Sequence, residues 1–198
     1  MPGINRQSKD VLIETISQDL SLGLSAHMIF PVMSDSEKDH EGTMAADDGM
    51  PLQSAVRDLK EKFGDEILLM TDACLCTSTD HGHCGLLEGH TILNDLSVEK
   101  LVEIALSHAR AGTDYVCLSD MMDGRVLSVR RSFENEGFKS TGIMSYSVKY
   151  ASSFYGPFRE AASSSPSFGD RSSHQMDVRS DYREAILEAR ADVSEGCD

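Results

Sequence analysis

The sequence predicts an α/β fold built around a parallel sheet. Short apolar runs that are typical of strands alternate with longer segments whose apolar residues recur at helical spacing. The apolar runs are nearly continuous, as in strands that are covered on both faces, and such strands favour a parallel sheet. Polar residues suited to chemistry follow these runs directly. The carboxyl ends of parallel strands form the ligand-binding edge in (β/α) barrels and in doubly wound sheets alike.

The first half of the chain contains two helix–strand pairs. Gly23 and Gly64 end the two helical patterns, as glycine commonly does. A stretch rich in Asp and Gly between 34 and 48 predicts a solvated loop. In order, the predicted elements are a helix over 11–20, a strand over 27–32, a helix over 51–63 and a strand over 67–74.

The second half continues the alternation. Ser97 is the expected N-cap of its first helix and Gly112 the expected C-cap. The predicted elements are a helix over 98–110, a strand over 115–118, a helix over 125–136, a strand over 142–146, a long Ser-, Pro- and Gly-rich loop over 162–171 and a helix over 182–194. Four strands are half of an eight-stranded barrel, which needs about 250 residues.

Length and composition restrict the class of protein. The 198 residues fit one domain with a sizeable core. A formal net charge of -15 argues against nucleic acid and anionic membranes as partners, since both attract basic surfaces. No apolar run approaches the roughly 20 residues that span a bilayer, and the first residues lack the apolar core of a signal peptide. Five clustered cysteines fit a reducing compartment, so the expected location is the cytoplasm.

The segment from Asp72 to Cys84 predicts a metal site. It holds three of the five cysteines and two histidines in thirteen residues. Cys74 and Cys76 leave an extended strand end on the same face, and a short loop returns Cys84 towards them. Three thiolates suit zinc or another soft ion, and they leave a fourth position for water or substrate. The alternatives are a disulfide, for which near neighbours have poor geometry, or three unrelated thiols.

Other candidate residues are less specific when taken alone. Lys149 follows the fourth strand among aromatic and hydroxyl groups, where a lysine can form a Schiff base, although most lysines are solvated surface cations. Arg159 and Arg171 flank the long loop and could bind a carboxylate through two hydrogen bonds each, or could form salt bridges in this acidic chain.

Four polar residues near the strand ends have two readings each. Asp120 or Asp123 could serve the site, but capping of the next helix is the commoner role. His81 and His83 lie inside the cysteine segment, where either could be a further metal ligand or could act in proton transfer.

Taken in order, these segments resemble the porphobilinogen synthase family, also called 5-aminolevulinate dehydratase. The match is specific over roughly residues 67–171 and weaker towards both ends. It rests on Asp72-Ala-Cys-Leu-Cys, His81-Gly-His-Cys-Gly85, Ser119-Asp-Met-Met-Asp-Gly-Arg-Val126, Ile143-Met-Ser-Tyr-Ser, Lys149-Tyr-Ala-Ser, Phe154-Tyr-Gly-Pro-Phe-Arg159 and Phe168-Gly-Asp-Arg171.

The resemblance implies a fold and an activity. The family is a (β/α)8 TIM barrel, of which residues 1–198 would form one partial domain containing about strands 2 to 5, with residues 162–175 as an active-site lid. Its members condense two 5-aminolevulinate molecules into porphobilinogen, with loss of two waters, in haem and tetrapyrrole biosynthesis. They assemble as homo-octamers through an amino-terminal arm that this chain lacks.

The resemblance also implies roles for individual residues. Cys74, Cys76 and Cys84 match the ligands of the catalytic zinc, and Lys149 matches one of two Schiff-base lysines. Asp72 and Ser119 match residues that line the active site. Arg159, Arg171 and Gln175 match groups that reach the substrate carboxylate, and Glu188 matches a glutamate that some members use at an allosteric magnesium site.

The chain departs from the family pattern in several places. The second Schiff-base lysine of the family lies after a segment like Glu195-Gly-Cys-Asp198, where this sequence stops, so we expect a fragment truncated at both ends whose activity alone is doubtful. Thr77-Ser78 replaces Pro-Tyr, Asp80 replaces a small hydroxyl residue, and His174 replaces Tyr. The alternative reading is an inactive paralogue or gene remnant that binds zinc or a partner protein.

Overall fold

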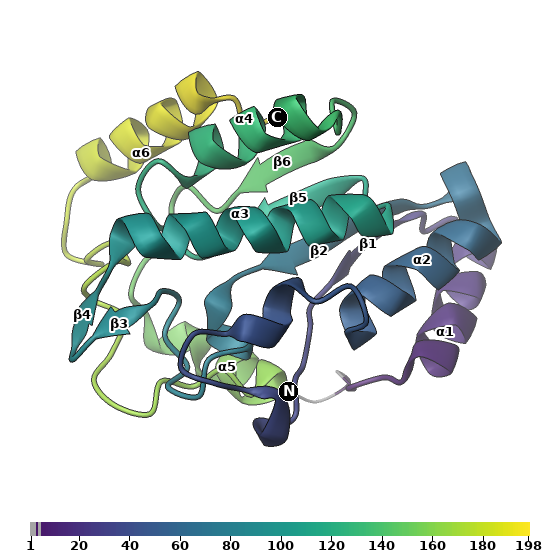
Figure 1. The fold of residues 1–198 in the computed structure, drawn as a ribbon, viewed down its shortest axis with the longest axis horizontal. Coiled ribbons are helices and arrows are strands. Elements are labelled where there is room, and N and C mark those ends of the chain that lie inside the picture. Colours follow the sequence, from purple (N-terminus) through teal and green to yellow (C-terminus); the bar gives the residue numbers. More distant parts are fainter. Residues whose placement is uncertain (1–2, 4) are drawn as a thin grey trace.

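The core of the fold is a parallel sheet of four strands. A computed structural model describes residue 3 and residues 5–198. Its sheet runs in the order β1 (Ala26–Ile29), β2 (Leu68–Ala73), β5 (Tyr115–Leu118) and β6 (Gly142–Ser145), and every neighbouring pair is parallel. The strand arrows therefore all end on one side of the molecule (Figure 1). This arrangement confirms the predicted α/β class and matches a partial (β/α) barrel.

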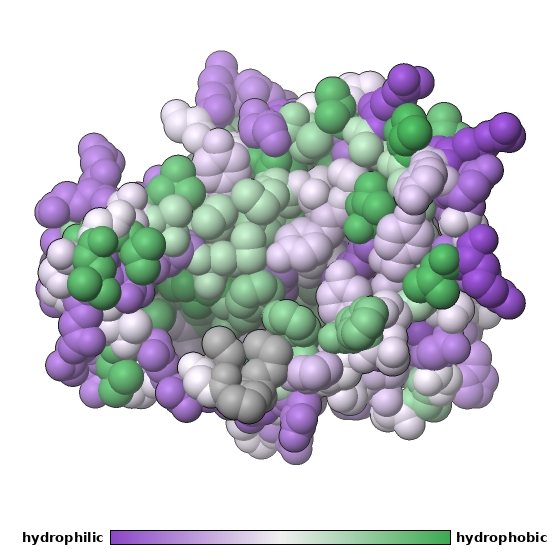
Figure 2. Space-filling model, turned by 180° about the vertical axis from the view of Figure 1, so that it is seen from behind, coloured by the Kyte–Doolittle hydropathy of each residue, from purple (hydrophilic) through white to green (hydrophobic). Residues whose placement is uncertain are grey.

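Helices connect the strands and cover the sheet. They are α1 (Lys9–Ser21), α2 (Pro51–Phe63), α3 (Asn94–Ala111), α4 (Arg125–Glu136), the short α5 (Gly156–Ala162) and α6 (Tyr182–Glu195). Helices α2, α3 and α4 lie over one face of the sheet (Figure 1). On the opposite side, Figure 2 shows apolar side chains gathered around a hollow in the centre of the face. Within the described residues, no helix is long and apolar enough to cross a membrane.

Two apolar clusters hold the layers together. One lies between the sheet and helices α3 and α4, and includes Val116, Ile143 and the fully buried Phe133. The other packs α1 and α2 against the first two strands, with Ile16 and Leu59 at its centre. Helical spacing in the sequence places these residues on the inward faces of their helices. The clusters fix the sheet, and the strand ends that carry the polar residues, in position.

The predicted elements agree with the structure in type and order, but two boundary predictions are wrong. The strand expected over 27–32 ends at Ile29, because Pro31 lacks the N–H group that would continue the ladder. Ser97 is not an N-cap, because α3 already begins at Asn94. Its hydroxyl donates to the Leu93 carbonyl at 2.6 Å and accepts from the Leu86 N–H at 2.8 Å, and it thus joins the helix to the segment before it. The C-cap prediction at Gly112 is confirmed, with a positive φ of 102°.

Two small elements were absent from the prediction. A hairpin of β3 (Leu87–Glu88) and β4 (Thr91–Ile92) precedes α3, and α5 precedes the long loop. Each is too short to leave a periodic pattern in the sequence. Both lie at the side of the molecule where the strands end (Figure 1).

A buried histidine in α3 predicts a pH-dependent stability. Burial lowers the pKa of His108 to about 4, so the folded chain binds a proton less readily than the unfolded chain does. Between pH 6.5 and 4 the unfolded state therefore takes up the extra proton, and the free energy of unfolding falls as the pH falls, by about 3 kcal/mol in all. We expect His108→Leu to flatten this part of the curve in urea titrations, and the exposed His90→Gln to leave it unchanged. An identical slope in His108→Leu would contradict the assignment.

Candidate metal and catalytic site

Three cysteines converge just beyond the end of β2. Cys74 continues the extended backbone, and a single 3-10 turn over Leu75–Thr77 then carries Cys76 back, so that its N–H meets the Cys74 sulfur at 3.5 Å. Cys84 joins them from the far end of the loop. The three sulfurs lie within 4.8 Å of one another, and all three side chains are buried. The structure therefore brings together the three cysteines that the sequence singles out, but a tight turn does so where an extended strand was expected.

The pKa values of the thiols in this group depend on the hydrogen bonds between them. The pKa of Cys76 lies well below its ordinary value because Cys74 and Cys84 hydrogen-bond to its sulfur, and the same contact with Cys76 raises the pKa of Cys74. Soft, partly ionised sulfurs that meet at one buried point are a donor set for a soft metal ion. In the described part of the chain, the five cysteines are free thiols, so the disulfide alternative is not formed there.

The loop between the cysteines is held by its own hydrogen bonds. Thr79 donates through its hydroxyl to the carbonyls of Leu75 and His83, both at 3.1 Å. His81 accepts the His83 N–H at Nδ1 and contacts the His40 carbonyl through Nε2 at 3.2 Å. The ligand atoms of His40, Asp80 and His81 also lie within 4.8 Å of one another. Because both ring nitrogens of His81 are already engaged, the loop uses this histidine as a structural support.

Lys149 lies buried near the cysteine group, on the segment that follows β6. Its Nζ donates to the Ser119 carbonyl at 2.5 Å and lies 5.4 Å from the ring centroids of both Tyr146 and Tyr155. Burial alone would lower the pKa of Lys149, but the negative charges of the three cysteines and of Asp72 outweigh it, and the pKa is raised. At neutral pH the amine of the metal-free chain is therefore held in its charged form.

Asp72 and Ser119 face the same space. Asp72 is the last but one residue of β2, and burial raises its pKa to about 7, against a hydrogen bond from Ser119 that lowers it. Its Oδ1 is buried with no hydrogen-bond partner among the described residues. A carboxyl group that titrates near neutrality can give or take a proton under physiological conditions.

A second group of side chains comes from the long loop and the helix before it. Arg159, on α5, and Arg171 line one cavity of about 210 Å³, together with Asp170, Ser172 and two serines from before α5. Arg171 is buried, and its Nη2 donates to the carbonyls of Gly82 at 3.1 Å and Ser164 at 2.6 Å. Gln175 is buried, and both polar atoms of its amide have no partner within the described part of the chain. Helix α5 and the loop therefore bring Arg159 and Arg171 to one cavity, and Arg171 also contacts the backbone of the cysteine loop.

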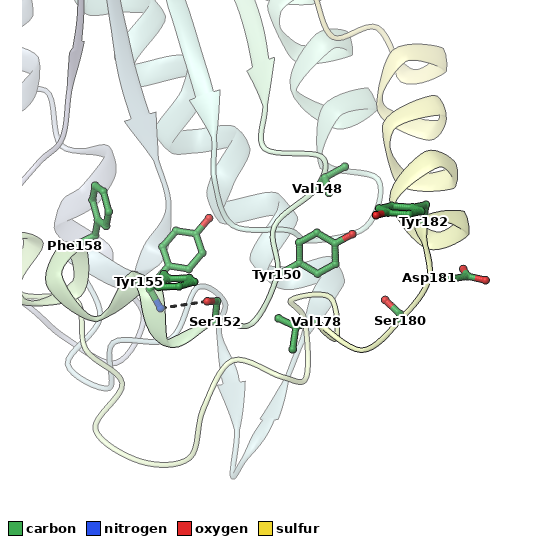
Figure 3. Close-up of a pocket in the computed structure, with 10 residues that line it drawn as sticks. Val148, Tyr150, Ser152, Tyr155, Phe158, Val178, Ser180, Asp181 and Tyr182 are labelled. Carbon is green, nitrogen blue, oxygen red and sulfur yellow. Dashed lines mark hydrogen bonds between the residues drawn. The ribbon is translucent and has the colours of Figure 1, made fainter.

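A larger cavity opens beside Lys149. It measures about 860 Å³ and is lined by aromatic and aliphatic side chains that include Tyr150, Tyr155, Val178 and Tyr182. Figure 3 shows these residues reaching it from the segment after β6, from the short helical turn over Ser153–Tyr155, and from α6 and the loop before it. Tyr155 borders both this cavity and the ammonium group of Lys149.

Known proteins of one family resemble this chain over its full length. The family model for delta-aminolevulinic acid dehydratase matches residues 1–198. The chain belongs to this family. Relatives called delta-aminolevulinic acid dehydratase include one from Bacillus subtilis, 46% identical over 198 residues, and one from Methanothermobacter thermautotrophicus, 50% identical over 198 residues. The whole chain aligns with each, and it spans 60% and 59% of their lengths.

A solved structure of the same family confirms the fold. The delta-aminolevulinic acid dehydratase from Toxoplasma gondii, in complex with the reaction product porphobilinogen, is 43% identical and superimposes with a TM-score of 0.96. The match covers 100% of this chain and 56% of that chain. The partial (β/α)8 barrel expected from the sequence is therefore confirmed.

Two acidic residues have roles different from the expected ones. Neither Asp120 nor Asp123 caps α4, whose N-cap is Gly124 with a φ of 74°. Asp120 is buried and accepts the Met122 N–H at 2.7 Å, and its Oδ1 lies 3.5 Å from Arg125 Nε. Asp120 therefore belongs to a buried ion pair.

That pair extends into a network that the sequence analysis missed. Arg125 also lies 3.4 Å from Asp192 of α6 and donates to the Ser145 hydroxyl at 2.8 Å, while Ser145 donates to Asp192 at 2.6 Å. A buried network of this kind fixes α6 against the ends of β5 and β6. Its partners lie up to 67 residues apart in sequence, so no local pattern shows them.

Glu188 lies beside this network on α6. The pKa of its carboxyl group is raised by burial and by the nearby negative charges of Asp123 and Asp192. Both causes disfavour the charged form of a carboxylate. Among the described residues it belongs to no group whose ligand atoms converge on one point.

His174 occupies a site position that sequence reasoning noted only as a departure from the family. Burial and the nearby Arg171 lower its pKa to about 4, so the imidazole is neutral at physiological pH. Its Nδ1 contacts the Ser173 hydroxyl at 3.1 Å, and its buried Nε2 has no partner among the residues that the structure describes.

The loop closes over the cysteine segment at Gly82. The Ser167 N–H donates to the His81 carbonyl at 2.9 Å, and the His83 ring contacts the Phe168 carbonyl at 3.1 Å. A Cβ on Gly82 would lie 2.3 Å from the Ser165 carbonyl oxygen, and the residue has a φ of +68°. Only glycine permits this close approach.

We therefore expect Gly82→Ala to release the loop while the cysteine group stays intact. The new Cβ overlaps the backbone of Ser165, so the loop has to move away. Limited proteolysis should cut residues 162–175 faster in the variant than in the wild type, and metal content should remain unchanged. The control is Gly89→Ala, which also has a positive φ but no atom within 4 Å of the added Cβ. Equal cutting rates in both variants would contradict the close-contact argument.

Proposed function

We propose that this chain forms part of a zinc-dependent porphobilinogen synthase, which condenses two 5-aminolevulinate molecules into porphobilinogen with the loss of two waters. The observation that carries the proposal is the buried Lys149 beside three convergent cysteines and two arginines. The reaction joins two amino ketones that each carry a carboxylate. It therefore needs a nucleophilic amine, a group that polarises a carbonyl, and cations that hold the carboxylates, and this site has a candidate for each.

The amine is Lys149. Its deprotonated Nζ attacks the ketone carbon of one substrate, a C–N bond forms, and the carbonyl oxygen leaves as water to give a Schiff base. Asp72, with its pKa near 7, is placed to pass protons in these steps, and Ser119 orients Asp72 and Lys149 through its hydroxyl and carbonyl.

Cys74, Cys76 and Cys84 fit zinc as its protein ligands. Their buried, mutually close sulfurs are the donors that zinc prefers, and three of them leave an open position. When bound there, zinc supplies a Lewis acid that polarises a substrate oxygen.

Glu188, with Asp123 and Asp192 nearby, supports a proposed second site for magnesium, since magnesium prefers oxygen ligands.

Arg159, Arg171 and Gln175 are proposed to bind the substrate carboxylate. The cavity of the two arginines adjoins the cysteine loop, and a planar guanidinium matches a carboxylate through two parallel hydrogen bonds. Residues 162–175 then act as the lid of a single partial domain, residues 1–198. By analogy with the family, we propose a cytoplasmic enzyme of tetrapyrrole biosynthesis that assembles as an octamer.

The proposed function is tested by joining residues 1–198 to the remaining 40% of the Bacillus subtilis relative, which aligns with the whole chain over 60% of its own length. We expect the chimera to form the pyrrole product in a colorimetric assay. Lys149→Met in the same chimera should lower the rate by several orders of magnitude, because the covalent route is lost. A folded, zinc-loaded chimera without activity would favour the alternative of a metal-binding protein that is not an enzyme.

A further inference from the structure

The carboxyl end of α5 is held by two cations from distant parts of the chain. Arg6 donates through Nε to the Ala161 carbonyl at 2.8 Å, and through Nη2 to the Glu160 carbonyl at 2.9 Å and the Ser163 hydroxyl at 2.7 Å. Lys38 donates through Nζ to the Ser163 carbonyl at 2.8 Å. We call Arg6 and Lys38 together the α5 clamp.

The clamp donates hydrogen bonds to carbonyl groups at the carboxyl end of α5. The last carbonyls of a helix have no partner within the helix and carry partial negative charge, which cations offset. Ser163, directly after α5, has a φ of 51° and a ψ of 41°, a left-handed conformation that is unfavourable for any residue with a Cβ. Such a conformation persists when its surroundings hold it on several sides, and here the clamp binds both the carbonyl and the hydroxyl of Ser163.

This turn sets the position of both arginines of the carboxylate cavity. Arg159 lies in the last turn of α5, and the Ser164 N–H donates to its carbonyl at 2.9 Å. The Ser164 carbonyl, one residue beyond Ser163, accepts the Arg171 guanidinium at 2.6 Å. A shift of the chain at Ser163 would therefore move the support of Arg159 and of Arg171 together.

We propose that Arg6 and Lys38 are positioning residues that fix the start of the lid, residues 162–175, and so place the two arginines that bind the substrate carboxylate. The identity of that ligand rests on the proposed function, whereas the mechanical link from the clamp to the lid stands on the contacts alone. The clamp residues touch neither the cysteine group nor Lys149 through any hydrogen bond in the described residues, so their removal leaves the metal site in place.

The first arm of the test measures hydrogen–deuterium exchange of residues 160–176 in the 198-residue chain. We expect the double variant Arg6→Gln/Lys38→Gln to exchange about tenfold faster there, as the loss of hydrogen bonds from charged donors implies, with unchanged exchange in the sheet. Compared with the double variant, replacing Arg6 by lysine instead of glutamine should restore part of the protection, because lysine keeps one charged donor. Arg183→Gln, an exposed arginine at the start of α6, is the matched control. Unchanged exchange in the double variant would overturn the proposal.

The second arm separates positioning from general stability. Lys149 is trapped by borohydride with 4-oxopentanoate, which carries a carboxylate, and with its methyl ester, which does not. The double variant should lose several-fold more yield with the acid than with the ester. Equal losses would overturn the positioning role. If the wild-type chain traps neither ketone, the proposed function of Lys149 fails, and the exchange result alone still decides for or against the clamp.

Discussion

Replacing Cys74, Cys76 and Cys84 together by serine is expected to abolish zinc binding. The wild-type chain should retain about one zinc ion after dialysis, because three buried sulfurs converge on one point, and hydroxyl groups in their place are poor ligands for a soft ion. Zinc at 100 times its dissociation constant should also raise the free energy of unfolding by about 2.7 kcal/mol in the wild type only. Metal analysis and thermal melts with and without zinc measure both effects.

The control for this experiment is Cys197→Ser, which removes a free thiol outside the group. It should keep full zinc content. Equal zinc retention in the triple variant would show that the metal lies elsewhere, and the assignment of all three ligands would then be wrong.

The second prediction concerns a covalent adduct between Lys149 and the substrate. Borohydride reduction in the presence of 5-aminolevulinate should produce an adduct at Lys149 alone, since this amine is buried between two tyrosine rings next to the proposed substrate site. The adduct is identified by mass spectrometry after digestion. Lys149→Met should abolish it, whereas substitution of the exposed Lys139 by Met should change nothing.

The pH dependence of this adduct follows from the charges around the amine. The pKa of Lys149 is raised by the three cysteines and Asp72, so the metal-free chain holds the ammonium form at neutral pH. Below its pKa, the neutral fraction rises about tenfold with each pH unit, and the yield should climb from pH 7 to pH 9. A yield that stays flat over this range, or an adduct on another lysine, would contradict the assignment.

The sequence was sufficient for the main elements of the fold because their signals are local. Apolar runs and helical spacing place β2, β5, α2 and α4 within one or two residues of their observed bounds. The Ser97 prediction failed because α3 begins three residues earlier, at Asn94, and the Ser97 hydroxyl bonds instead to the backbone of Leu93 and Leu86. Short elements such as the β3–β4 hairpin are stabilised by the loops around them and leave no periodicity of their own.

The convergence of the three cysteines was predictable from the sequence, whereas the contacts around the candidate site were not. Cys74, Cys76 and Cys84 stand close together in the sequence, so their convergence could be expected. The support of Lys149 by the Ser119 carbonyl, the closure of the loop on Gly82 and the reach of Arg6 to α5 all join residues 30 to 155 positions apart. Such contacts depend on how the layers pack, which a single sequence does not state.

The closeness of the three sulfurs has a further consequence for the metal-free protein. A thiolate is the form of cysteine that oxidants attack, and Cys76 has a pKa far below that of an ordinary thiol, with two other thiols within 4.8 Å. Oxidation of Cys76 to a sulfenic acid would place an electrophilic sulfur next to Cys84, and condensation of the two, with loss of water, would give a disulfide. Metal bound to the same sulfurs would protect them from this chemistry. The supply of metal would thus also set the sensitivity of this site to oxidative stress.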